Sequence, residues 1–101
     1  MKYYKYDLQA RYDARQSFYG KARVYEMDNG AKVLESYSTL VAVIEKDNLF
    51  LRGRYSQTTT RHIREFMSQN GFHKQTLKEM AEYMATNDTI FNKYARLICV
   101  G

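Results

Sequence analysis

Hydroxyl, arginine and histidine side chains gather in one short stretch of this chain. The stretch reads Tyr-Ser-Gln-Thr-Thr-Thr-Arg-His-Ile-Arg and runs from Tyr55 to Arg64. Hydroxyl donors beside arginines suit the binding of a phosphate or a carboxylate at the start of a helix, where backbone amides are unpaired. The same residues also suit a plain helix cap with arginines on an exposed helix face. The residues expected to contact a partner here are Tyr55, Ser56, Thr58, Thr59, Arg61, His62 and Arg64.

A second set of candidate binding residues lies on two predicted strands. Two tyrosines, a lysine and an arginine occupy every second position of one strand and so share a face, and two arginines share a face of another strand. If both sets point away from the helices, they form a basic, aromatic surface of the kind that stacks bases and follows phosphates. The other interpretation is a solvated face on which cations guard the sheet edges against aggregation. This set consists of Tyr19, Lys21, Arg23, Tyr25, Arg52 and Arg54.

The usual signatures of catalysis and metal binding are missing from the sequence. His62 and His73 fall on different predicted elements and Cys99 is distant from both, whereas zinc ligands are usually closely paired. There is no nucleophile elbow, no phosphate-binding glycine loop and no dinucleotide fingerprint. We therefore expect no metal, no cofactor and no enzymatic activity.

The composition describes one basic domain. The 101 residues carry a formal net charge of +5, and six of the ten tyrosines fall in the first 25 residues. Positive charge with interleaved aromatic residues fits nucleic acid or an acidic protein surface as the partner. A single cysteine excludes an internal disulfide and fits a reducing cytoplasm. We expect no membrane contact, because there is no signal peptide and no apolar run of spanning length.

Four strands and the tight turns between them are predicted for residues 17–55. Apolar and polar residues alternate along the strands, and Asp28-Asn29-Gly30 supplies the left-handed backbone that a tight hairpin needs. Successive turns of this kind describe an antiparallel meander. The predicted strands cover residues 18–27, 32–37, 39–45 and 49–55.

Two helices are predicted to follow within residues 58–86. Thr58 or Thr59 would cap the first helix, and Asn70-Gly71 would end it with a left-handed residue. The Thr76–Glu79 segment forms a capping box at the start of the second helix.

The predicted fold is therefore α+β, a single domain over residues 1–101 with both helices packed on one face of the meander. The other sheet face would stay open to solvent or a partner. Residues 1–15 form either a Tyr-rich arm or an edge strand. The tail, residues 89–101, fits a helix or a strand, and we expect a loop followed by a terminal strand. Because exposed sheet edges can pair with a second copy of the chain, a homodimer is an open alternative.

Two motifs of this chain resemble the signature of a known group of proteins. The run Ser36–Ala42, followed by Tyr55–Phe66 and Gln69–Phe72, is similar to the "SYxTxVA … YSxTTxRHxxxF" pattern of small bacteriophage and plasmid proteins of Gram-positive bacteria. The similarity covers residues 18–72. Those proteins are mostly of unknown function, so the resemblance implies a mobile-element setting in the cytoplasm of a bacterial host, and little chemistry. By analogy, small phage accessory proteins include inhibitors of host defence nucleases, such as anti-CRISPR proteins.

The residues and the resemblance together favour a non-catalytic binding protein of a phage or related element. It would occupy a charged surface of a host protein or nucleoprotein, with a CRISPR effector as the favoured case. The alternatives are a direct DNA- or RNA-binding protein that uses the sheet face and, least favoured, a small enzyme that acts at the Thr/Arg/His turn. Since proteins that mimic DNA are acidic, this basic chain would grip an acidic patch, or nucleic acid held by the nuclease.

Overall fold

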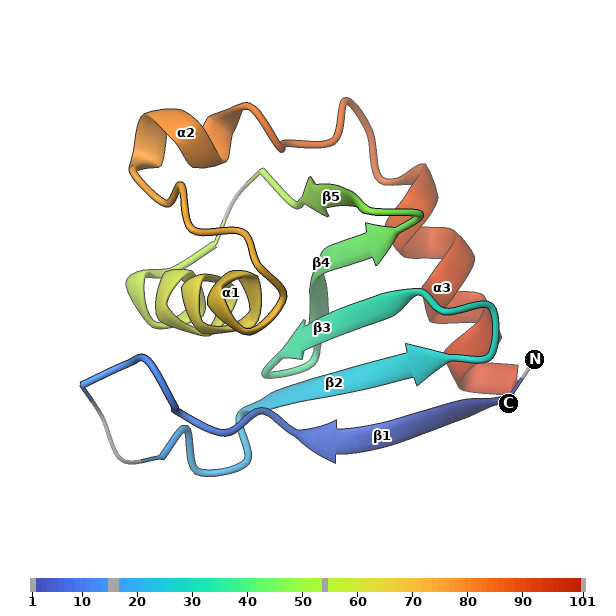
Figure 1. The fold of residues 1–101 in the computed structure, drawn as a ribbon. Helices are drawn as coiled ribbons and strands as arrows, with labels where there is room; N and C mark the ends of the chain where they lie inside the picture. Colours follow the sequence, from blue (N-terminus) through green and yellow to red (C-terminus); the bar gives the residue numbers. More distant parts are fainter. Residues whose placement is uncertain (1, 15–16, 54, 101) are drawn as a thin grey trace.

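A five-stranded antiparallel sheet with helices on both of its faces forms the body of the molecule in the computed structural model, which describes residues 2–14, 17–53 and 55–100 (Figure 1). The strands follow one another as a meander, so the predicted α+β class is confirmed. The strands are β1 (Tyr3–Asp7), β2 (Ala22–Met27), β3 (Lys32–Ser36), β4 (Thr39–Glu45) and β5 (Asn48–Leu51). The helices are α1 (Gln57–Gln69), α2 (Leu77–Ala81) and α3 (Thr89–Val100).

Strand β1 settles the choice between an N-terminal arm and an edge strand. It pairs antiparallel with β2, from Tyr3 opposite Met27 to Asp7 opposite Arg23. The meander therefore has one strand more at its beginning than the sequence predicted.

Strand β2 begins later than predicted, at Ala22 instead of Phe18. Tyr19 and Gly20 have φ values of 53° and 73° and form a tight turn. A hydrogen bond of 3.0 Å from the N–H of Lys21 to the carbonyl of Phe18 closes this turn. Because left-handed backbone cannot continue a strand, the alternation seen in the sequence passes into a turn here.

The β3–β4 turn contains a second tyrosine whose backbone is in the left-handed conformation. Tyr37 has a φ of 58°, so β3 ends at Ser36, one residue earlier than predicted. A β-bulge close to this turn shifts the register of β3 against β4 between Leu34 and Glu35. Bulges re-aim neighbouring side chains, and this one lies next to the residues that lead into the turn.

Helix α1 covers one face of the sheet. Its apolar stripe, which includes Ile63, Phe66 and Met67, is fully buried in the core that α1 shares with β2–β5. Asn70 ends the helix, and Gly71 follows with a φ of 85°, as predicted.

Helix α2 is shorter than predicted. The Thr76–Glu79 capping box is present, but the helix stops at Ala81. Beyond it, the N–H of Leu51 donates to the carbonyl of Tyr83 at 2.8 Å, and the N–H of Ala85 donates to the carbonyl of Leu51 at 2.9 Å. The chain therefore leaves the helix and hydrogen-bonds to the edge of β5, because pairing there satisfies backbone groups that the sheet leaves open.

Helix α3 covers the other face of the sheet, which the sequence predicted to be open. Phe91 and Tyr94 are fully buried there against Tyr25, Val33 and Val43. The predicted terminal strand is therefore wrong. The two helices predicted from the sequence do share one face, because α1 and α2 both contribute to the core on that side, but α3 adds a helix on the opposite face. The apolar residues of the tail recur at helical spacing, and the sheet face they cover is itself apolar.

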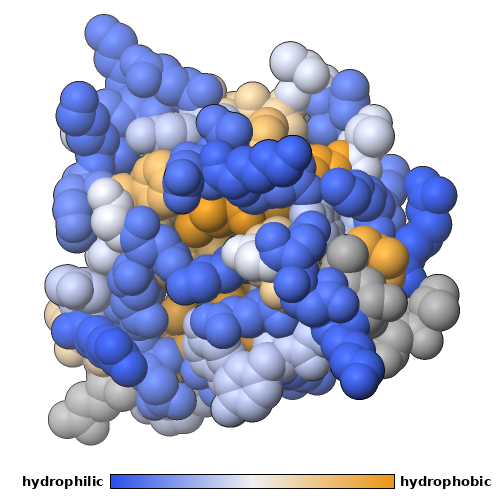
Figure 2. Space-filling model, turned by 45° about the vertical axis from the view of Figure 1, so that its right-hand side comes forward, coloured by the Kyte–Doolittle hydropathy of each residue, from blue (hydrophilic) through white to orange (hydrophobic). Residues whose placement is uncertain are grey.

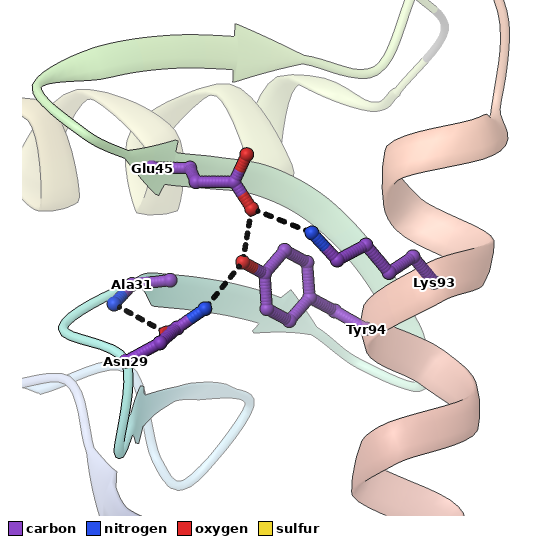
Figure 3. A network of polar contacts seen from close by, with 5 residues as sticks. All are labelled: Asn29, Ala31, Glu45, Lys93 and Tyr94. Atoms are coloured by element: carbon purple, nitrogen blue, oxygen red, sulfur yellow. Dashed lines mark hydrogen bonds and ion pairs between the residues drawn. The ribbon is translucent and has the colours of Figure 1, made fainter. Parts of the chain in front are cut away.

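A cluster of polar side chains, here named the α3 clasp, fastens α3 to two turns of the sheet (Figure 3). The Tyr94 hydroxyl donates to the Glu45 carboxylate and accepts from the Asn29 amide at 3.2 Å. Lys93 Nζ lies 3.0 Å from the same carboxylate. The hydrogen bonds from Tyr94 and Lys93 lower the pKa of Glu45, while burial and the bond to Glu45 raise the pKa of Tyr94.

None of the helices that the structure describes is long and apolar enough to cross a membrane.

Candidate functional site

The residue that caps α1 is Ser56, which lies before both threonines predicted for that role. Its hydroxyl accepts the N–H of Thr59 at 3.2 Å. Its carbonyl accepts both the N–H and the hydroxyl of Thr60, each at 3.0 Å. The cap therefore occupies Ser56 and Thr60 fully, and these side chains are not available to an anion.

A buried trio of polar side chains joins the two sequence motifs. The Ser36 hydroxyl lies 2.8 Å from the Thr59 hydroxyl and 2.8 Å from His62 Nδ1. All three side chains are buried, with Ser36 only 3% and His62 only 1% exposed. The Phe18 ring packs edge-on against the His62 ring, with 4.7 Å between their centroids. The trio fixes the start of α1 against the end of β3.

The distance between Ser36 and His62 is that of a nucleophile and its base. However, Ser36 is buried and does not line the neighbouring cavity, so a substrate in that cavity would not reach its hydroxyl. The trio thus acts as a connection between elements. In the parts of the chain that the structure describes, no group of three His, Cys, Asp or Glu side chains could hold a metal ion.

A cavity of about 220 Å³ opens beside this trio, between two turns and the first part of α1. One wall is the turn that precedes β2, the second is the β3–β4 turn, and the third is α1. The residues that line it are Ser17, Phe18, Tyr19, Lys21, Tyr37, Thr58, Arg61 and His62.

Two tyrosines with left-handed backbone line this cavity. Tyr19 is 79% exposed and Tyr37 is 48% exposed. Their turns are joined, because the N–H of Tyr37 donates to the carbonyl of Lys21 at 2.7 Å. A tyrosine at positive φ is unfavourable by about 1 kcal/mol or more, so the fold holds these two rings outward at some cost in stability.

The cavity has an unbalanced positive charge. Lys21 and Arg61 line it without any acidic residue, and neither forms an ion pair with a described residue. By contrast, four cations elsewhere are paired with carboxylates. We name the surface formed by Tyr19, Lys21, Tyr37, Thr58 and Arg61 the α1 corner.

The predicted partner-binding stretch divides into residues at this corner and residues turned away from it. Thr58, Arg61 and His62 line the cavity, while Thr59 lies buried behind it. Arg64 points elsewhere, since its Nε donates to the carbonyl of Gln75 at 3.2 Å.

Tyr55, before the cap, is half-buried and packs against the α1 side of the core. Burial raises the pKa of its hydroxyl, while the charge of Arg64 opposes that rise.

The second predicted set does not form one surface. Tyr19 and Lys21 lie at the α1 corner, while Tyr25 is buried under α3. Arg23 pairs with the Glu35 carboxylate at 3.1 Å.

Arg52 also lies beneath the tail. It pairs with Asp88 at 3.2 Å, and its guanidinium lies 4.6 Å from the centroid of the Phe91 ring. Arg54 lies outside the described residues. The expected open, basic sheet face is therefore wrong, because α3 covers it.

The sequence reasoning missed Ser17, Phe18 and Tyr37 as cavity residues. Tyr37 had a detectable signal, because an aromatic residue in a two-residue link between strands cannot pack inside the sheet. Ser17 and Phe18 had none, since their place depends on how two turns meet in space.

A second, larger cavity of about 470 Å³ lies between β5 and the start of α3. Of its charged residues, Glu45 and Lys93 pair with each other and Glu82 adds a second acid, while much of the remaining lining is apolar. Figure 2, which brings the α3 side forward, shows a mostly hydrophilic face with hydrophobic residues gathered near its middle. This cavity lacks the unpaired cations of the α1 corner.

Comparison with known sequences places the chain in a family. Residues 6–82 match a family of unknown function, DUF8033, and this stretch contains the whole lining of the α1-corner cavity. No curated protein and no solved structure matches the chain significantly. Since the match spans well over half of the 101 residues, the protein belongs to the DUF8033 family.

Proposed function

We propose that this protein is a non-catalytic binding protein that engages a macromolecular partner through the α1 corner. The observation that carries the proposal is the pair of exposed tyrosines, Tyr19 and Tyr37, held at positive φ beside Lys21 and Arg61. Tyrosine and arginine are the residue types that dominate binding energy at protein interfaces. Residues that a fold holds in an unfavourable backbone conformation, such as these two tyrosines, are also more common at binding sites than elsewhere.

The positive charge of the α1 corner indicates the charge of the partner surface that it would contact. Lys21 and Arg61 line one cavity, and none of the other described residues in its lining is acidic. A partner surface that is negative at this point gains attraction and orientation from both cations. The partner therefore carries an acidic patch or a nucleic acid.

The resemblance to small phage and plasmid proteins supports a host protein or nucleoprotein as the partner. Within that class we propose a defence nuclease of the CRISPR type, inhibited in the cytoplasm of the host by occupation of a charged surface. Direct binding of DNA or RNA is the second candidate, and one observation favours it. Tyr19 and Lys21, two residues first assigned to nucleic acid, lie in the same cavity as Arg61.

The proposal is tested by titrating the protein into a DNA-cleavage reaction of a purified CRISPR effector from a Gram-positive host. The variant Tyr19→Gly removes the exposed ring and also relieves the left-handed backbone, so it keeps the fold. We expect the wild-type protein to inhibit cleavage and Tyr19→Gly to need at least about tenfold more protein, as for loss of an interface hot spot.

A matched control is available in the β4–β5 turn. Lys46 also has a positive φ, of 51°, and lies outside the lining of the cavity. Lys46→Gly relieves the same kind of strain and should inhibit like the wild type. Failure of the wild-type protein to inhibit would argue against a defence nuclease as the partner. Equal inhibition by Tyr19→Gly and Lys46→Gly would argue against the α1 corner.

A further inference from the structure

The charge and size of the α1-corner cavity identify the class of group that it would hold. Among the residues that the structure describes, two cations, Lys21 and Arg61, line the same space of about 220 Å³, and no acidic residue shares that lining. A carboxylate would neutralise only one of them, whereas a phosphate group carries up to two negative charges and several acceptor oxygens. The charge balance therefore favours a phosphate.

Among the described lining residues, a serine and a threonine hydroxyl group remain available as donors. Ser17 Oγ accepts the N–H of Tyr19 at 2.9 Å, which leaves its own O–H to donate. Thr58 lines the cavity and makes no side-chain hydrogen bond to the part of the chain that the structure describes. Thr59, in contrast, is held by Ser36. The donors that face the cavity thus come from two separate segments.

The aromatic rings indicate what is attached to the phosphate. The cavity is smaller than a typical pocket for a drug-sized ligand, so a larger ligand would extend past Tyr19 and Tyr37 at its border. Exposed aromatic rings next to cations are the standard platform on which bases stack in single-stranded nucleic-acid sites. A flat base outside the cavity and a phosphate inside it would satisfy both features.

We infer that the α1-corner cavity binds a nucleotide unit, with its phosphate between Lys21 and Arg61 and its base against Tyr19 or Tyr37. This inference rests on the proposed function and makes it more specific, because it names the chemical class of the group that the α1 corner would contact. A doubly charged phosphate could come from a free nucleotide or from the 5′-terminal phosphate of a strand, because an internal phosphodiester carries only one charge, so the test includes both sources.

The test is calorimetric titration of the full-length protein at low salt with inorganic phosphate, uridine, UMP, and octauridylates with and without a 5′-phosphate. We expect UMP to bind at least about tenfold more tightly than either uridine or inorganic phosphate, because UMP alone among these three ligands contacts both the cations and the rings. The octauridylates separate the two sources. If the 5′-phosphorylated octauridylate binds more tightly than UMP, and its affinity weakens steeply with salt, the source is a strand; if it binds no more tightly than UMP, the source is a free nucleotide. The octauridylate without the 5′-phosphate should bind more weakly than the phosphorylated one.

Charge variants assign the binding to the cavity. Arg61→Gln should weaken UMP binding at least about tenfold. Arg96→Gln, a matched change of an exposed arginine on α3, should leave it unchanged. The inference is overturned if neither UMP nor an octauridylate binds, if uridine or inorganic phosphate binds as tightly as UMP, or if Arg61→Gln binds UMP normally. If Tyr19→Gly no longer inhibits cleavage but the wild-type protein binds no nucleotide, the α1 corner remains the proposed binding site and only the nucleotide inference fails.

Discussion

At the scale of single residues, the Ser36 hydroxyl is the connection on which the α1 corner depends. It lies 2.8 Å from both the Thr59 hydroxyl and His62 Nδ1. Ser36 belongs to the strand that leads into Tyr37, and His62 belongs to the helix that carries Arg61. These two bonds therefore set the relative position of an exposed ring and an exposed cation.

Replacing Ser36 with alanine should lower the free energy of unfolding by about 1–3 kcal/mol, because two buried polar groups lose a hydrogen bond where water is excluded. Urea denaturation at pH 7 measures this change. Ser38→Ala is the matched control, because Ser38 is exposed in the same turn and should change stability by less than about 0.5 kcal/mol. Equal stabilities of the two variants would show that the buried trio is not a structural connection.

The sequence predicts a site residue when its contacts are local in the chain, and misses it when the contacts form only through the fold. Arg61, His62 and Thr58 were found because they are close together in sequence and follow a helix start. The burial of Thr59 could not be foreseen, since it depends on Ser36, which reaches α1 only through the fold. Tyr19 was found for a different reason, as part of an open sheet face that the structure does not have.

At the scale of elements, α3 changes what the sheet can do. It buries the face that the sequence predicted to be open, and the α3 clasp holds it on the β2–β3 and β4–β5 turns (Figure 3). The sequence left helix and strand open for this tail because its apolar residues fit both. The apolar sheet face, not local propensity, decides in favour of the helix.

Tyr94→Phe tests the clasp. The ring stays buried, but the hydroxyl bonds to Glu45 and Asn29 are lost, so the free energy of unfolding should fall by about 1–3 kcal/mol at pH 7. The control is Tyr83→Phe, because the half-buried Tyr83 hydroxyl makes no hydrogen bond to the residues described here, and its ring packs edge-on against Phe72. Tyr83→Phe should unfold like the wild type.

The clasp also predicts a dependence on pH. The pKa of Glu45 is lowered in the folded protein from an ordinary value of 4.5. Its contribution to stability is therefore complete above that value and is lost as the pH falls through the folded pKa. Urea denaturation from pH 7 to pH 3 should show a shallower acid-side loss in Tyr94→Phe than in the wild type. Parallel curves would show that Tyr94 does not set the titration of Glu45.

At the scale of the whole molecule, helices cover both faces of the sheet, so a partner would bind at the ends and corners of the fold. Four ion pairs neutralise cations on or near the sheet, while Lys21 and Arg61 stay unpaired among the described residues. The sequence predicted the basic character of the chain and its α+β class. It could not predict where the charge would be uncompensated, because ion pairs such as Arg52–Asp88 form between distant segments.

The most direct test of the account is site-specific photo-crosslinking in bacterial host cells, with a photoreactive phenylalanine analogue placed at one exposed tyrosine at a time. Tyr19 and Tyr37 lie at the α1 corner, and Tyr4 and Tyr12, each 66% exposed, lie outside the lining of its cavity and serve as controls of similar exposure. We predict one discrete crosslinked partner from positions 19 and 37, its loss in Arg61→Gln, and no such product from positions 4 and 12. A partner crosslinked from positions 4 or 12 but not from 19 or 37 would contradict the assignment of function to the α1 corner.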